Sequence, residues 1–206
     1  MSRVVPYNAL SIPELAPTLR DIAPKFAAIR RLALPGILIP EAGVDDQTAM
    51  ATLQPILAAC GVRVHCTIPP IWHKDGKGDQ PLHIDAIPSD ETSVGMVVQC
   101  TAVGGADIVL ATLADPFCKE LVQRNAHIDD PEKADYSLPE GTEALLNEGL
   151  IDPEVLRPDV YLGSVAAGGA IMFAFGGPNP VAHRFSTTTP ERCAQGYIVP
   201  FTRLSA

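Results

Sequence analysis

Short apolar runs, separated by glycine, proline and polar turn residues, recur through most of the chain. Runs of this length and composition predict strands at 35–40, 62–68, 92–103, 107–113, 161–165, 171–175 and 193–201. Twenty prolines and sixteen glycines in 206 residues interrupt the chain often. Such frequent interruption favours many short strands over a helix bundle. The pattern therefore predicts a mainly β protein with some flanking helix.

Two segments near the N-terminus show helical rather than alternating spacing. In 12–32, apolar residues recur at near-helical intervals, and Ser11 and Glu14 form a capping-box pattern at the start. A second helix is predicted over 45–59, where the pattern begins at an acidic pair and stops before a glycine. We therefore expect residues 1–61 to form a largely helical N-terminal part.

The segment 114–160 reads as a helical insertion between core strands. A helix is predicted over 115–124 with Asp115 as an acidic cap, followed by a polar loop and a short helix within 139–147. Long connections beside a pocket often act as lids, so a lid over an active site is one hypothesis. A surface elaboration that supports a homodimer is the alternative.

The length and charge of the chain limit its partners. Residues 1–206 suit one domain that buries a substantial core. The formal net charge is −9, and Arg30-Arg31 is an isolated basic pair. Binding to phosphate backbones is driven by clustered Lys and Arg. A nucleic-acid partner is therefore disfavoured, and a small-molecule substrate is expected.

Cysteine usage and hydropathy indicate the compartment. The five cysteines (60, 66, 100, 118 and 193) are scattered, and none belongs to a Cys-x-x-Cys pair. This is neither a disulfide framework nor a zinc ribbon, and reduced thiols are expected. No apolar run approaches membrane-spanning length, and the N-terminus lacks a signal-peptide core. We expect a cytoplasmic protein without a membrane partner.

The strongest chemical signal is a pair of histidines and one aspartate. His83 and Asp85 stand two residues apart, so on a strand their side chains face the same way. His183 follows a second strand-forming run and offers another imidazole. Two histidines and one carboxylate on one face of an ion leave its other positions open. That ligand set is the facial triad of non-haem Fe(II) oxygenases.

The order of motifs over roughly residues 80–201 resembles the Fe(II)/2-oxoglutarate-dependent dioxygenases. His-x-Asp is followed by Gly104-Gly105 opening a strand, then by the distal His183 and, nine positions later, by Arg192. The resemblance implies a double-stranded β-helix (jelly-roll, cupin-like) core with the N-terminal helices packed outside the sheet.

The resemblance also implies roles for individual residues. His83, Asp85 and His183 would ligate Fe(II), and Arg192 would bind the distal carboxylate of 2-oxoglutarate, the co-substrate used with O2. Family members often carry serine two residues after that arginine, where this chain has Ala194. Ser186 or one of the threonines at 187–189 is the alternative second anchor. The implied reaction is hydroxylation, desaturation or cyclisation of a small molecule.

Neighbouring residues offer substrate contacts and rival ligands. Trp72 and His73 lie in a turn-rich loop that leads into the His-x-Asp motif, where substrate contacts are expected. A buried structural anchor is the alternative role of Trp72. His127 and Asp129 form a second His-x-Asp in a polar segment, where rigid metal geometry is harder to hold. Arg184 should point to the face opposite His183.

Two other functions use the same residues. A cupin-like metalloenzyme that does not use 2-oxoglutarate could hold its ion with these three ligands. A jelly-roll binding module, in which His83 and His183 are structural, would not be an enzyme at all.

Overall fold

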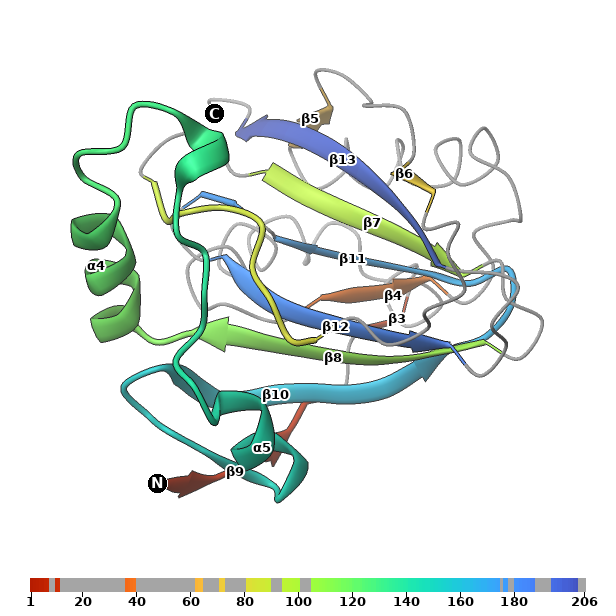
Figure 1. Ribbon diagram of the computed structural model, residues 1–206. Helices are drawn as coiled ribbons and strands as arrows, with labels where there is room; N and C mark the ends of the chain where they lie inside the picture. The colour runs from red at the N-terminus through yellow and green to blue at the C-terminus, as the bar shows by residue number, and fades with distance from the viewer. Residues whose placement is uncertain are drawn as a thin grey trace.

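The computed structural model describes residues 1–7, 10–11, 36–39, 62–64, 71–72, 81–89, 94–100, 105–174, 176–177, 180–187 and 194–203. Strands in antiparallel and mixed sheets dominate these ranges, with few helices (Figure 1). The predicted mainly β class is therefore confirmed. The predicted helices over 12–32 and 45–59 lie outside the described residues. No helix in the described part of the chain is both long and apolar enough to span a membrane.

One sheet has four strands and carries most of the well-defined core. Its order is β12 (Val181–Thr187), β8 (Ala106–Leu113), β10 (Leu156–Val165) and β2 (Val5–Pro6). The central strand β8 is antiparallel to β12 and β10, which places His183 opposite Leu110 and Leu110 opposite Tyr161. Gly105 precedes β8 with a φ of 81°, a left-handed conformation that glycine adopts without strain.

The second sheet has seven strands and faces the first (Figure 1). Its members are β3 (Leu10–Ser11), β4 (Ile37–Ile39), β11 (Ala170–Ala174), β7 (Val94–Cys100), β13 (Ala194–Arg203) and β5 (Val62–Val64), with β6 (Ile71–Trp72) paired to β13. Separately, β1 (Ser2–Arg3) pairs with β9 (Leu150–Ile151).

The space between the two sheets is an apolar core. Strands β8, β10, β11 and β12 all contribute buried side chains to it, namely Ala106, Ile108, Leu110, Tyr161, Val165, Ile171, Phe173, Val181 and Phe185. Alternate residues of each strand supply these side chains, as the period of two requires. Burial also raises the pKa of the Tyr161 phenol. The core therefore presents an apolar wall to any polar group on the inner face of β12.

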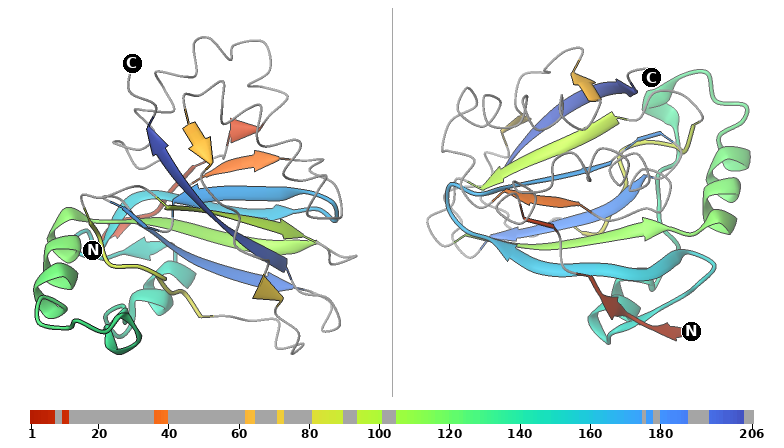
Figure 2. Two further views of the ribbon diagram at one scale, coloured as in Figure 1. Left: turned by 90° about the horizontal axis from the view of Figure 1, so that it is seen from above. Right: turned by 180° about the vertical axis from the view of Figure 1, so that it is seen from behind.

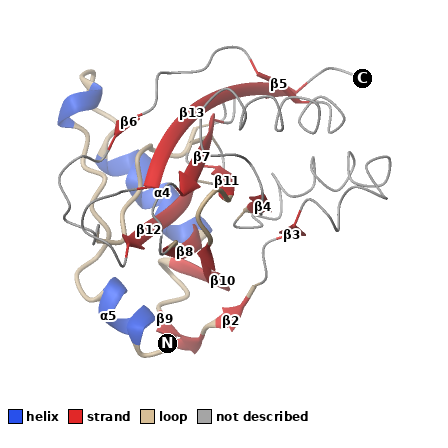
Figure 3. Cartoon of the chain, turned by 90° about the vertical axis from the view of Figure 1, so that its right-hand side faces the viewer, coloured by secondary structure: helices blue, strands red, loops and turns tan. Residues whose placement is uncertain are grey.

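The other face of the four-stranded sheet is covered by the segment between β8 and β10. Helix α4 (Asp115–Arg124), the 3-10 turn η2 (Pro131–Lys133) and helix α5 (Thr142–Asn147) lie there. Phe117, Leu121 and Leu146 pack with Val109 and Ala111 of β8 in a second buried cluster. The helices gather on one side of the strands in both views of Figure 2, and Figure 3 shows α5 beside β9.

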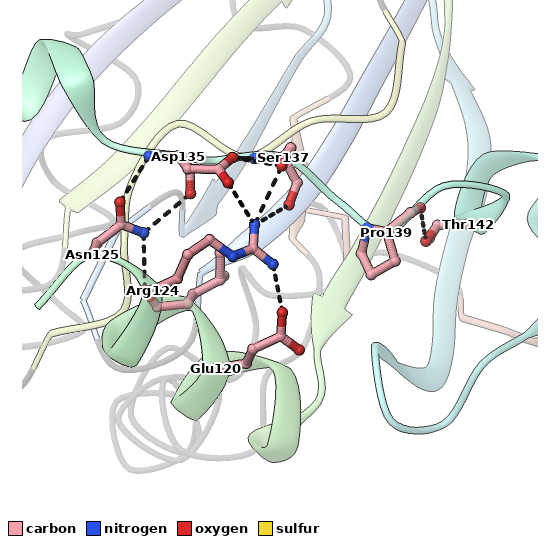
Figure 4. Close-up of polar contacts among 8 residues, drawn as sticks. Glu120, Arg124, Asn125, Asp135, Ser137, Pro139 and Thr142 are labelled. Carbon is pink, nitrogen blue, oxygen red and sulfur yellow. Dashed lines mark hydrogen bonds and ion pairs between the residues drawn. The ribbon is translucent and has the colours of Figure 1, made fainter.

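Polar contacts fasten the loop between the two helices to the end of α4. The Arg124 guanidinium donates to Glu120, to the Asp135 carboxylate (3.2 Å) and to the Ser137 carbonyl (3.1 Å) (Figure 4). The buried Asn125 amide donates to the Asp135 carbonyl at 3.1 Å and accepts from its N–H at 2.7 Å. These hydrogen bonds attach the loop to α4. That this segment acts as a lid and responds to substrate stays a prediction.

Two details of the sequence analysis of this segment are wrong. The residue at the N-cap of α4 is Ala114, without a side-chain cap, and Asp115 lies in the first turn. The Asp115 carboxylate instead accepts from Arg157 at 2.6 Å. Strand β10 begins at Leu156, inside the expected insertion, with a register shift before Val160. This irregularity is adjacent to Pro158, which cannot donate to a ladder.

The buried face of α4 supplies a direct test of this packing. Leu121 is fully buried, whereas the next residue, Val122, is 45% exposed. We expect Leu121→Ala to lower the free energy of unfolding by about 2–5 kcal/mol, because it leaves a cavity against the sheet. Val122→Ala should change it by less than about 0.5 kcal/mol. Urea unfolding followed by circular dichroism measures both, and equal losses would contradict this packing.

Candidate metal centre

His183 stands on the inner face of β12, with aromatic core side chains against its ring. Its side chain is only 2% exposed. The Phe173 and Phe185 rings lie with centroids 4.8 Å and 5.7 Å from the imidazole. A buried polar group without a partner is costly. The Nδ1 atom meets that need on one side, 3.3 Å from the Val181 carbonyl oxygen.

His83 is placed beside His183 by the backbone. The His83 N–H donates to the His183 carbonyl at 3.0 Å, and the His183 N–H donates back at 2.8 Å. This reciprocal antiparallel pair puts the two side chains on the same face. The imidazole centroids are 4.2 Å apart, with the ring planes at 56°.

The expected strand through His83 and Asp85 is wrong. Residues 81–89 are mostly bend and irregular backbone, and the His83 bridge is a single isolated one. Pro81 and Pro88 flank the motif. Because proline has no backbone N–H, neither residue can donate a hydrogen bond that would extend the pairing. Asp85 is brought to the histidines by a bend rather than by regular strand alternation.

The Asp85 carboxylate approaches the Nε2 atoms of both imidazoles. One carboxylate oxygen is 3.2 Å from Nε2 of His183, and the other is 3.7 Å from Nε2 of His83. The side chains of His83 and Asp85 are 32% and 33% exposed. The group therefore has a closed side at His183 and an open side at His83 and Asp85.

Hydrogen bonds at Nδ1 orient both imidazoles for binding at Nε2. Nδ1 of His83 lies 2.8 Å from the Pro81 carbonyl oxygen, the same i−2 relation that links His183 to Val181. A carbonyl only accepts, so the neutral tautomer that satisfies each contact carries its proton on Nδ1. The Nε2 atom of each ring then faces the Asp85 carboxylate. A backbone carbonyl that holds the second ring nitrogen is the usual support of a metal-binding histidine.

These three residues fit a divalent metal ion by chemistry and by proximity. Among the described residues they form a group whose ligand atoms all lie within 4.8 Å of one another. Ligand bonds of about 2.1 Å at right angles would bring such atoms to about 3 Å apart. The Asp85 contact to His183 is already close to that separation. The donors suit Fe(II) and related ions, and the open side leaves room for further ligands.

The rival His127 and Asp129 do not join this group. Both residues are exposed in the polar stretch after α4. Within the described part of the chain, no third candidate ligand groups with His127 and Asp129.

The remaining residues proposed from the sequence are only partly covered by the described structure. His73 and Arg192 lie outside the described residues. Trp72 is on β6, with its backbone paired to Gln195 of β13. Ser186 alternates to the outer face of β12, where it lines a cavity with Arg184. The roles given to Trp72, His73, Arg192 and Ser186 stay predictions.

The outer-face cavity has a volume of about 550 Å³. It is lined by Pro81, Asp107, Ile108, Val109, Glu143, Leu162, Gly163, Arg184 and Ser186. The expectation that Arg184 points away from His183 is therefore confirmed. Glu143, which the sequence analysis did not single out, lies beside Arg184. No local sequence signal marks it, because its partners are about forty and sixty positions away.

No protein-family model matches the sequence, and no curated protein matches it. Similar solved structures include PvcB, an Fe, alpha-ketoglutarate dependent oxygenase from an isonitrile synthetic pathway, at 12% identity and TM-score 0.42, over 95% of this chain and 82% of PvcB. A second PvcB structure, from Pseudomonas aeruginosa, aligns at 12% identity and TM-score 0.39, over 87% and 79%. AAD-2 in complex with Mn(II) and N-oxalylglycine aligns at 11% identity and TM-score 0.35, over 98% and 91%. At these low scores the likeness does not carry an activity over to this chain.

The geometry predicts which histidine is needed for metal binding. We expect the protein to bind one Fe(II) per chain, measured anaerobically by titration and metal analysis. His83→Ala removes a ligand, so its loss of affinity should exceed the about 10–100-fold typical of an outer-shell change. His127→Ala is the matched control and should bind normally. Loss of binding in His127→Ala with normal binding in His83→Ala would identify the other His-x-Asp as the metal site.

Proposed function

We propose that this protein is a non-haem Fe(II)- and 2-oxoglutarate-dependent oxygenase that acts on a small molecule. The observation that carries the proposal is the convergence of two carbonyl-supported imidazoles on one carboxylate, with one side exposed. Two histidines and one carboxylate are the ligand set of this enzyme class. The order of motifs from His83 to Arg192 supports the same class.

We extend the proposal to a jelly-roll core. Two sheets packed face to face around an apolar centre support it, because a double-stranded β-helix is built from such a pair. In this arrangement His183 lies on a core strand, and His83 lies on a segment attached to the edge of that strand.

The residues would divide the work according to their burial. His183 is held between aromatic rings and closes the apolar side, which limits access of water there. His83 and Asp85 hold the opposite edge and face the side from which ligands enter. Bound iron supplies oxidation of the substrate by O2, coupled to decarboxylation of 2-oxoglutarate. The chain itself contributes ligand orientation and the shape of the surroundings.

Recognition of the co-substrate is assigned to Arg192 in this proposal. A guanidinium binds a carboxylate through two parallel hydrogen bonds, which suits the distal end of a five-carbon diacid. In sequence, Arg192 stands between β12, which ends at Thr187, and β13, which begins at Ala194. Ser186 remains the proposed second anchor, although its place on the outer face of β12 does not support that role.

One observation favours a different function, a binding module with structural histidines. His183 is almost fully buried among aromatic rings, as a structural histidine would be. A cupin-like metalloenzyme without 2-oxoglutarate would share the three ligands instead. Metal binding separates the first alternative from the proposal, and co-substrate binding separates the second.

The co-substrate is tested directly by anaerobic titration. We expect 2-oxoglutarate added to the Fe(II)-loaded protein to produce the weak visible charge-transfer band of the iron chelate. The matched control is His183→Ala, which should show no band. An Fe(II)-loaded protein that never binds 2-oxoglutarate would support the cupin-like alternative, and a protein that binds no metal would support the binding module.

The carboxylate anchor has its own test. Arg192→Ala should retain Fe(II) but bind 2-oxoglutarate about a hundredfold or more weakly, since losing one partner of a buried ion pair costs about 3–5 kcal/mol. Arg157→Ala, which removes an arginine that pairs with Asp115 on the surface, is the control and should bind normally. Unchanged co-substrate affinity in Arg192→Ala would mean that the anchor lies elsewhere.

A further inference from the structure

Glu143 contacts the immediate neighbours of both histidines with a single carboxylate. Its Oε1 accepts from the Arg184 guanidinium at 2.6 Å, and Arg184 directly follows His183. Its Oε2 accepts from the Leu82 N–H at 3.4 Å, and Leu82 directly precedes His83. One side chain on α5 therefore joins two segments that are a hundred residues apart in the chain.

The segment that carries His83 and Asp85 has few backbone attachments in the described residues. The reciprocal pair between His83 and His183 is one, and the Ser89 N–H donating to the Gly177 carbonyl at 3.1 Å is another. Between and around them the backbone bends rather than forming a ladder. Leu82 and Ile84 are buried against the outer face of the four-stranded sheet. A contact at Leu82 therefore affects how firmly this segment, and with it His83, is held on the edge of β12.

Glu143 is itself held in a defined position. Leu146 anchors α5 in the outer cluster, and the Thr142 hydroxyl donates to the Pro139 carbonyl at 2.7 Å (Figure 4). Arg184 also donates to the Asn147 side chain at 3.2 Å, so two residues one helical turn apart receive the same guanidinium. The side chains of Arg184 and Glu143 are only 26% and 37% exposed.

We propose that Glu143 is a positioning residue for the candidate metal centre, acting from the opposite face of the sheet. By binding Leu82 and Arg184 together, its carboxylate holds the 81–85 segment against β12 and keeps the two imidazoles at their spacing. The metal part of this inference rests on the proposed function. The proposal that Glu143 holds the 81–85 segment against β12 does not depend on a bound metal. Glu143 thus acts on the site through the residues next to His83 and His183 in the chain, and not by contacting the two histidines.

The first experiment measures affinity for Co(II), added alone to the full chain. We expect Glu143→Ala to weaken binding about 10–100-fold, as removal of an outer-shell support does, and to change the d–d absorption of bound Co(II). Glu143→Gln retains an acceptor for Leu82 and Arg184→Met leaves the carboxylate free for Leu82, so each should show an intermediate loss. The control is Glu148→Ala, which removes an exposed carboxylate from the end of the same helix and should bind normally.

A double variant shows whether Arg184 acts through Glu143. If it does, Glu143→Ala combined with Arg184→Met should weaken Co(II) binding by less than the product of the two single effects. If the loss of affinity in the double variant equals the product of the two single losses, the two residues act independently. That result would overturn the proposal that Arg184 acts through Glu143. Thermal unfolding of each variant, compared with Glu148→Ala, separates a loss of ligand geometry from a loss of fold.

The second experiment does not need a metal. Amide hydrogen exchange should become faster at Leu82 and His83 in Glu143→Ala, while Leu110 and Tyr161 in the adjoining sheet stay protected. Unchanged exchange at both residues, together with Co(II) affinity within twofold of the wild type, would overturn the inference. Should the wild type bind no Co(II), the proposed function fails. The exchange result alone then decides whether Glu143 holds the segment.

Discussion

The candidate site depends on one backbone interaction, the reciprocal hydrogen bonds between His83 and His183. Directly opposed residues of an antiparallel pair project their side chains to the same face. The backbone bonds therefore bring together two imidazoles from distant parts of the chain, and no contact between the rings is needed for this. The same bridge brings Asp85, two residues further on, within reach of both Nε2 atoms.

Burial gives the two histidines different environments. His183 lies in the apolar core, so its N–H needs an acceptor, and the Val181 carbonyl meets Nδ1 while Nε2 faces the Asp85 carboxylate. His83 is a third exposed and needs this less. The demands of a buried imidazole and those of a metal ligand coincide here, since both require a fixed tautomer and a fixed ring plane. This coincidence explains why burial alone does not separate a structural histidine from a ligand.

Strand β12 lies between the apolar core on its inner face and a cavity with charged side chains on its outer face. Its inner residues face the aromatic core, and its outer residues Arg184 and Ser186 face the cavity beside α5. The helices that cover the outer face are fixed by buried leucines and by the polar contacts of Arg124 and Asn125. The predicted insertion at 114–160 therefore also supports the sheet. Through Glu143 it reaches the backbone on either side of the two histidines.

Local patterns in the sequence were sufficient to predict strands β7, β8 and β11, the helix at 115–124 and the candidate ligands. Alternation and helical spacing are properties of neighbouring residues, so the apolar run at 107–113 and the period of α4 could be interpreted directly. Alternation also placed Arg184 on the face opposite His183. Ser186, three residues after His183, could have been assigned to that outer face by the same rule.

The tertiary structure alone decided which distant segments meet. No local pattern indicates that His83 bridges to His183 through a single isolated pair, because the register between two segments is a property of the assembled sheet. The bend that turns Asp85 toward the imidazoles, and the contact of Glu143 with Leu82 and Arg184, have the same origin. The sequence by itself determined the residue types available for the site. Packing of the two sheets and of α5 determined their positions, since those contacts join residues that are between forty and a hundred positions apart.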